Sequence, residues 1–362
     1  MTNLPADLLG RPAAQSVRLI ALGYLEDAAN AFERTGNPDD AMALHDFRVA
    51  LRRLRTTLRA YRPLLDDSVR GKPHKRLGKI AEGTNRVREA EVALEWLRPL
   101  VTGMTAGQRV GLHWLIERID TRRAKDLERY LADTRASFTQ AMRKLHKGLV
   151  AYRQTVQTEP SINDESFAAV LRTAAVEQAR ELDQLLGEIH QTEDEAAHRA
   201  RIAAKRLRYV VEPVRGTLAG GGELISRLKT IQDLLGELHD LQELEKTVRT
   251  AVGTAAAERA EQLLDVTLAE PAPAGPRPRR RGRQSGLVAI AKRIRIREAD
   301  LFAALQRDWL GNKRTWATDV AGLMPGSGPL TAVVPVPVAA PAVVPVPVAA
   351  PVVRRWSGRR PA

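Results

Sequence analysis

The feature that most constrains this chain is a pair of matching segments 153 residues apart. The first, HDFRVALRRLR at 45–55, and the second, HRARIAAKRLR at 198–208, share six of eleven residues, and two further positions exchange Val for Ile and Arg for Lys. A second pair, at 79–89 and 230–240, matches at a spacing of 151 residues. Because the two spacings nearly agree, the sequence predicts one helical hairpin unit that occurs twice. We therefore expect two related halves, about 12–156 and 164–310, with approximate two-fold symmetry.

Apolar residues recur at helical spacing along most of the chain. The predicted helices cover about 12–35, 41–62, 74–98, 107–156, 164–190, 193–217, 222–269 and 287–310. No alternating strand pattern occurs before residue 330, and aromatic residues make up only 4% of the chain. The predicted fold class is all-α, a helical bundle of two pseudo-symmetric halves that forms one domain at 12–310.

Two segments interrupt or follow this domain. Residues 270–286 are rich in Pro, Gly and Arg, which predicts a disordered basic insertion. Residues 318–362 carry the sequence VVPVPVAAP twice, at 333–341 and 343–351. Such proline density forbids a helix or a central strand, so we expect an extended, disordered tail that acts as a spacer.

The net charge of +14 favours an anionic partner, but the charge is unevenly distributed. Residues 271–362 carry a net charge of +12, whereas residues 1–270 carry only +2. An anion site in the folded body must therefore arise from the arrangement of its charges.

The chain contains no cysteine, which excludes disulfides, zinc-thiolate sites and thiol nucleophiles. No stretch approaches the roughly 20 apolar residues of a membrane-spanning helix, and the first residues lack the pattern of a secretory signal. We expect a cytoplasmic protein.

On a helix, the basic residues of each matching segment form a stripe. The first stripe lies beside an apolar face and comprises His45, Arg48, Arg52, Arg55 and Arg59. The second comprises His198, Arg201, Lys205 and Arg208, with Glu212 at the place of Arg59.

Like charges at these spacings destabilise a helix. Asp46 is the only acidic residue between 45 and 62 that could offset them. One stripe alone is typical of a solvated face whose arginine stems cover apolar surface. Its repetition favours a binding role instead. Because the planar guanidinium donates two parallel hydrogen bonds to phosphate, two facing stripes predict a groove for a linear polyanion.

The double motif resembles the CHAD family, the conserved-histidine α-helical domain, over about residues 12–310. This resemblance implies a helical bundle whose basic cleft binds inorganic polyphosphate, with association to polyphosphate granules. The implied binding residues are those of the two stripes. Basic residues at or next to the second pair of matching segments are further candidates for the cleft wall, namely Arg76, Lys79, Arg227 and Lys229. The Leu-Gly-x-x-Arg-Asp pattern of the family is kept loosely, with Arg88-Glu89 in the first half and His239-Asp240 in the second.

Three other functions compete with this interpretation. A metal site would use Glu195 and His198, but a di-iron site needs a second such pair and two further Glu residues, and we expect no metal or other cofactor. An enzyme acting on phosphate would need a phosphate loop, carboxylates for magnesium or an activated nucleophile, and no GxxxxGK[ST] occurs, so we expect no enzymatic activity. Nucleic acid is the main alternative partner, bound without sequence preference through the basic segments at 277–283 and 354–360.

Overall fold

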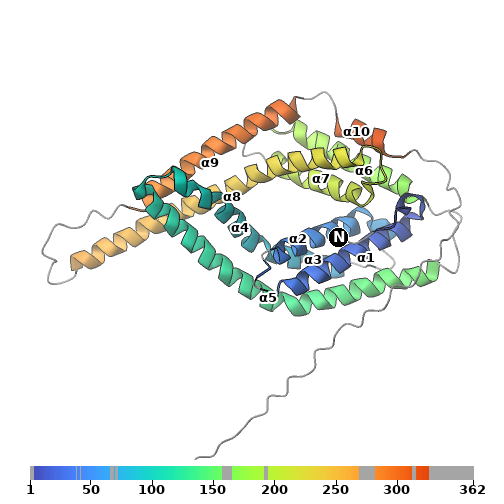
Figure 1. Cartoon of the computed structure of the whole chain (residues 1–362), viewed down its shortest axis with the longest axis horizontal. Coiled ribbons are helices and arrows are strands. Elements are labelled where there is room, and N and C mark those ends of the chain that lie inside the picture. Colours follow the sequence, from blue (N-terminus) through green and yellow to red (C-terminus); the bar gives the residue numbers. More distant parts are fainter. Residues whose placement is uncertain are drawn as a thin grey trace, which may run out of the picture. The chain divides into compact units, whose positions relative to one another are not determined.

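The computed structural model describes residues 4–37, 39–40, 42–65, 69, 72–156, 165–190, 195–268, 282–311 and 315–325. Its helices are α1 (Ala13–Arg34), α2 (Ala43–Ala60), α3 (Lys72–Gly83), α4 (Asn85–Leu97), α5 (Ala106–Val156), α6 (Phe167–Gly187), α7 (Glu195–Val211), α8 (Gly221–Leu268), α9 (Gln284–Leu305) and α10 (Trp316–Leu323). Across these ranges the only extended pairing is an isolated bridge between Pro12 and Ser166. The all-α fold class is confirmed (Figure 1).

The stripe helix α2 shows why these sequences form packed helices. Phe47, Leu51, Leu54 and Leu58 recur at helical spacing and are buried, and they place one face of α2 against α1. The basic residues occupy the adjoining face. Burial of this apolar face, rather than helix propensity alone, holds the helix in place, because its charges repel one another.

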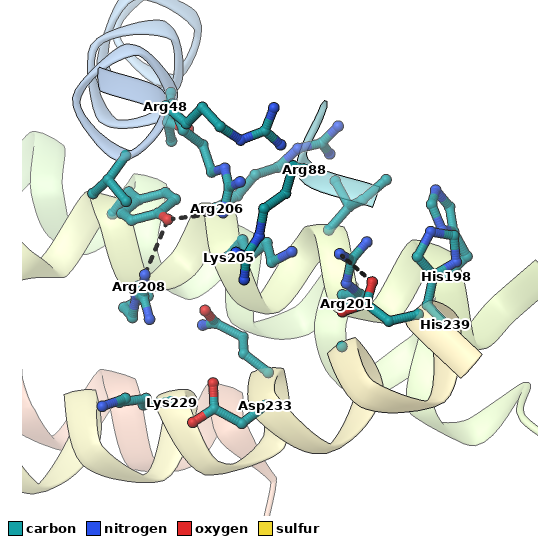
Figure 2. A pocket seen from close by; sticks show the side chains of 18 of the residues that line it. Arg48, Arg88, His198, Arg201, Lys205, Arg206, Arg208, Lys229, Asp233 and His239 are labelled. Carbon is teal, nitrogen blue, oxygen red and sulfur yellow. Dashed lines mark hydrogen bonds and ion pairs between the residues drawn. The ribbon is translucent and has the colours of Figure 1, made fainter. Parts of the chain in front are cut away.

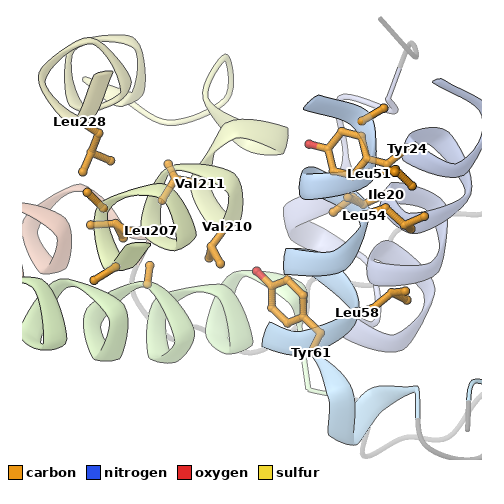
Figure 3. Packing of buried hydrophobic residues seen from close by; sticks show 14 of the residues in the cluster. Ile20, Tyr24, Leu51, Leu54, Leu58, Tyr61, Leu207, Val210, Val211 and Leu228 are labelled. Atoms are coloured by element: carbon orange, nitrogen blue, oxygen red, sulfur yellow. The ribbon is translucent and has the colours of Figure 1, made fainter. Parts of the chain in front are cut away.

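Two helical hairpins form the part of the fold that carries the stripes. Helix α1 packs along α2, α6 packs along α7, and α2 meets α7 directly. One continuous hydrophobic cluster includes residues of both hairpins, among them Leu51 and Leu207, and Tyr61 lies between the two groups (Figure 3). The helices of the two halves follow the same order, with α1, α2, α3 with α4, and α5 in the first half and α6, α7, α8 and α9 in the second. This order is the one that the predicted duplication requires, and the duplication itself stays a prediction.

A second hydrophobic cluster lies among α4, α5, α8 and α9. It includes Leu94, Leu112, Leu241 and Ile290. Helix α9 packs against part of the longer helix α8. Within the described ranges, no helix combines the length and apolarity that crossing a membrane requires.

The predicted helix at 74–98 is interrupted in the structure. Helix α3 ends at Gly83 and α4 begins at Asn85, with the buried Thr84 between them. The Thr84 hydroxyl donates to the carbonyl of Ala81 at 2.6 Å. A side chain at Gly83 would lie within 3.0 Å of the Tyr130 ring, so glycine permits the close approach of α3 to α5.

The C-terminal boundary of the fold also differs from prediction. The expected disordered tail from residue 318 is wrong for residues 318–323, which belong to α10. Asp183 of α6 accepts hydrogen bonds from the backbone N–H groups of Trp316 at 2.8 Å and Ala317 at 2.9 Å, and so caps this helix. Residues 326–362, including both VVPVPVAAP repeats, lie outside the described residues. So does most of the predicted insertion at 270–286, whose residues 284–286 open α9.

Candidate functional site

The two stripes line a single cleft of about 1340 Å³. All five residues of the first stripe and all four of the second are among its lining residues. Figure 2 shows Arg48 of α2 and Arg88 of α4 on one side of the cleft, and Arg201, Lys205 and Arg208 of α7 facing α8. Segments far apart in the sequence are therefore brought together at the contact of the two hairpins.

Arg48 is held where α3 gives way to α4. Its guanidinium donates to the hydroxyl of Thr84 and lies 3.5 Å from the side-chain oxygen of Asn85. Burial, together with the nearby cations Arg52 and Arg88, lowers the pKa of Arg48 to about 10. The helix break thus fixes the first arginine of the stripe.

Lys205 of α7 is partly buried in the wall of the cleft and lies among cations. Burial first, and then Arg201 and Arg52, lower the pKa of its ammonium to about 6. Asp240 of α8 opposes this shift and lies 4.0 Å from the Arg201 guanidinium. This single carboxylate does not compensate the cluster, so the free protein holds Lys205 largely neutral at pH 7.

Three stripe arginines retain unused hydrogen-bond donors. The Nε–H groups of Arg55, Arg201 and Arg208 are buried and have no acceptor among the described residues. Buried polar groups in folded proteins are nearly always paired, so three unpaired donors grouped on the lining of one cleft favour a ligand at that place. An anion in the cleft would supply acceptors for these groups.

Two histidines of the cleft, one from α7 and one from α8, contact each other. The rings of His198 and His239 lie 4.8 Å apart between centroids and stand side by side in Figure 2. Burial, followed by Arg201 and His198, lowers the pKa of His239 to about 4. Burial and Arg88 lower the pKa of His45 as well. Within the described part of the chain, no three His, Asp or Glu side chains form a group that could hold a metal ion.

Carboxylates from other helices also reach the cleft. Its lining holds ten Lys and Arg residues and seven Asp and Glu residues, so its excess of positive charge is modest. Glu181 of α6 pairs with Arg206 at 3.2 Å, whereas Asp46 pairs with Arg34 at 2.9 Å, away from the cleft. From the sequence we expected the stripes to lack counter-ions. Their own helices indeed supply few carboxylates, but other helices bring carboxylates to the same cleft.

A family model for the CHAD domain matches residues 21–249, more than half of the chain. This chain belongs to the CHAD family. Polyphosphate binding is a known property of that family. The matched range contains both stripes, the second part of α1, the helices α2 to α7 and the first part of α8.

Solved structures share the CHAD fold. The crystal structure of the CHAD domain from the plant Ricinus communis matches with a TM-score of 0.62 and 18% identity, over 87% of this chain and 97% of that one. PptA from Streptomyces chartreusis matches with a TM-score of 0.53 and 17% identity, over 83% of this chain and 99% of that one. At these identities the likeness concerns the fold. No curated protein sequence matches this chain.

Three of the four additional CHAD-based candidates do not line the cleft. Lys229 does, but Arg76 donates to Gln140 of α5, and Lys79 is absent from the lining. Arg227 pairs with Asp319 of α10 at 2.7 Å and stacks over the Trp316 ring at 4.8 Å. Two residues along a helix turn the side chain by roughly 200°, so Arg227 and Lys229 necessarily face different neighbours.

The structure adds cleft residues that the stripes did not include. These are His74, Arg88, Arg206, Tyr209 and His239. Arg88 and His239 occupy equivalent places in the second pair of matching segments, so the duplication was a signal for both. His74 and Tyr209 have no such signal, because their position depends on how the helices cross.

Proposed function

We propose that this protein binds inorganic polyphosphate in the cleft between α2 and α7, and that it does so without chemical conversion of the ligand. The observation that carries the proposal is the convergence of two repeated basic stripes whose buried Nε–H donors lack acceptors within the described residues. Phosphate oxygens would accept from these donors, and a linear polyanion would contact both stripes at once.

The geometry favours a chain of phosphates over a single small anion. The donors come from Arg55 on α2 and from Arg201 and Arg208 on α7, and the latter two are about 10 Å apart along their helix axis at 1.5 Å per residue. One phosphate group cannot reach all of these positions. A polymer with a charge on every unit can, and in the cell such binding would place the protein on polyphosphate granules.

The test compares two variants that each lose four basic groups. The cleft variant is Arg48→Ala/Arg52→Ala/Arg201→Ala/Lys205→Ala. The matched control, Lys125→Ala/Arg129→Ala/Arg143→Ala/Lys144→Ala, changes exposed residues of α5 outside the cleft. Binding of labelled polyphosphate and of single-stranded DNA is measured near physiological salt, and circular dichroism confirms the fold.

We expect the cleft variant to lose at least about 100-fold in polyphosphate affinity, because hydrogen bonds to charged groups each contribute about 1.5–3 kcal/mol. The control should stay within a few-fold of the wild type. If the cleft variant binds polyphosphate normally, the basic segments at 277–283 and 354–360 become the explanation, and DNA should then bind comparably. Release of phosphate by the pure protein would contradict the absence of chemistry.

A further inference from the structure

A buried tyrosine connects the two stripes. Tyr209, near the end of α7, is only 1% exposed, yet it is one of the residues that line the cleft. The hydroxyl oxygen accepts from Arg52 of α2 at 3.4 Å and from Arg208 of its own helix at 3.0 Å. Figure 2 marks the second of these bonds beside the label of Arg208. The Arg208 guanidinium also stacks over the tyrosine ring at 4.7 Å from its centroid.

This contact has no counterpart in the other copy of the motif. At the spacing of 153 residues, the equivalent of Tyr209 is Thr56, which also lines the cleft and is too short for the same bridge. One tyrosine therefore serves a stripe residue from each half. The contact that Tyr209 makes between the hairpins is therefore asymmetric.

We propose that Tyr209 is a positioning residue that holds Arg52 and Arg208 toward one shared ligand, an inference that rests on the proposed polyphosphate site. Two guanidinium groups repel each other and carry long, freely rotating stems. A phenolic oxygen that accepts from both offsets part of this repulsion and fixes their orientation before the ligand arrives. The cost of ordering them is then met during folding rather than on binding.

The geometry also leaves the proton of the Tyr209 hydroxyl available to donate a hydrogen bond. A tyrosine hydroxyl both accepts and donates hydrogen bonds, whereas a guanidinium only donates them. Because the bonds from Arg52 and Arg208 use the oxygen of Tyr209 as the acceptor, its proton remains to donate to a phosphate oxygen between the two guanidinium groups. The same hydroxyl would thus orient the cations and contact the anion.

Tyr61 provides a matched control from the same region. It is 3% exposed and packs against Phe167, with 5.7 Å between ring centroids. Its buried hydroxyl has no hydrogen-bond partner among the described residues, and Tyr61 is not a lining residue of the cleft. Tyr61→Phe therefore removes a buried hydroxyl without disturbing the arginines.

The experiment is a double-mutant cycle on polyphosphate affinity. Tyr209→Phe is measured in the wild type and in an Arg52→Ala/Arg208→Ala background, with thermal unfolding recorded for every variant. We expect Tyr209→Phe to weaken binding about tenfold in the wild type, since a hydroxyl between charged partners is lost. In the Arg52→Ala/Arg208→Ala background the loss should shrink to at most about twofold, because the residues through which Tyr209 acts are gone. Tyr61→Phe should bind as the wild type does.

The possible outcomes separate this inference from the function on which it rests. An equal loss in both backgrounds would mean that Tyr209 has only a structural role, and unfolding of Tyr209→Phe would likewise overturn the proposal. If Arg52→Ala/Arg208→Ala weakens binding but Tyr209→Phe does not, only the role of Tyr209 is wrong. If Arg52→Ala/Arg208→Ala binds normally, the cleft is not the polyphosphate site.

Discussion

The guanidinium of Arg53 on α2 and the carboxylate of Glu212 at the end of α7 form two hydrogen bonds, at 3.1 and 2.5 Å. Both side chains are largely buried, with 14% and 11% of their surface exposed. Glu212 occupies the place of Arg59 in the other copy of the motif. The second copy thus exchanges a stripe cation for a carboxylate that joins the two hairpins.

Removal of the Glu212 charge should destabilise the fold without weakening polyphosphate binding, because neither Arg53 nor Glu212 lines the cleft. We expect Glu212→Gln to lower the free energy of unfolding by about 2–4 kcal/mol, since it leaves a largely buried guanidinium without its counter-ion. Denaturant unfolding measures this loss. The apolar double variant Arg53→Leu/Glu212→Leu should recover most of it, and a double variant as unstable as Glu212→Gln would contradict this account of the pair.

Lys205→Met should stabilise the protein while weakening polyphosphate binding. Burial lowers the pKa of Lys205 to about 6, against an ordinary 10.5. Between pH 6 and pH 10.5 the unfolded chain holds a proton on Lys205 that the folded chain lacks, so the free energy of unfolding rises with pH. The destabilisation caused by Lys205 is therefore fully present below pH 6 and disappears as the pH approaches 10.5. We expect a gain of about 1–3 kcal/mol at pH 7, larger at pH 5.5 and absent near pH 10.5.

Thermal and denaturant unfolding across this pH range test the prediction for Lys205. A destabilised Lys205→Met variant, or a gain that does not change with pH, would show that Lys205 is not held at a cost in the free protein. A stabilised variant that also binds less polyphosphate would show that the cleft trades stability for function.

Polyphosphate binding should take up protons. The groups that act on Lys205 are Arg201, Arg52 and Arg208, which lower its pKa, and Asp240, which raises it. Bound phosphates add negative charge and raise the pKa of Lys205, so at pH 8 the amine should be neutral in the free protein and charged in the complex. Affinity should therefore fall as the pH rises above about 6.

Calorimetry in buffers of different ionisation enthalpy reports this proton uptake directly. We expect a net uptake at pH 8 that is smaller in Lys205→Met than in the wild type. Equal binding enthalpies in all buffers at pH 8 would contradict the linkage.

The sequence was sufficient to predict most of the helices and the two stripes, for a definite physical reason. Helical geometry alone places His45, Arg48, Arg52 and Arg55 on one side of α2, and the repeat does the same on α7. No tertiary information is needed for either step. The convergence of the stripes then follows from the packing of two similar hairpins.

Features set by tertiary contacts could not be predicted in this way. Tyr209 and Glu212 depend on how α2 crosses α7, and the carboxylate of Asp240 depends on where α8 lies. Arg227 was assigned to the cleft because it lies next to the matching segment at 230–240, although its neighbour in the fold is α10. The break at Thr84 reflects the approach of α3 to the Tyr130 ring, which helical periodicity does not encode.

The most direct test of the central claim is the salt dependence of polyphosphate binding in the cleft variant Arg48→Ala/Arg52→Ala/Arg201→Ala/Lys205→Ala and in the α5 control. Each lost cation–phosphate contact should reduce the slope of log affinity against log salt by about 0.7–0.9, as in nucleic acids. We predict that the slope of the cleft variant is smaller than that of the wild type by about 3, and that the control keeps the wild-type slope. An unchanged slope in the cleft variant would contradict the claim that the two stripes hold the polyanion.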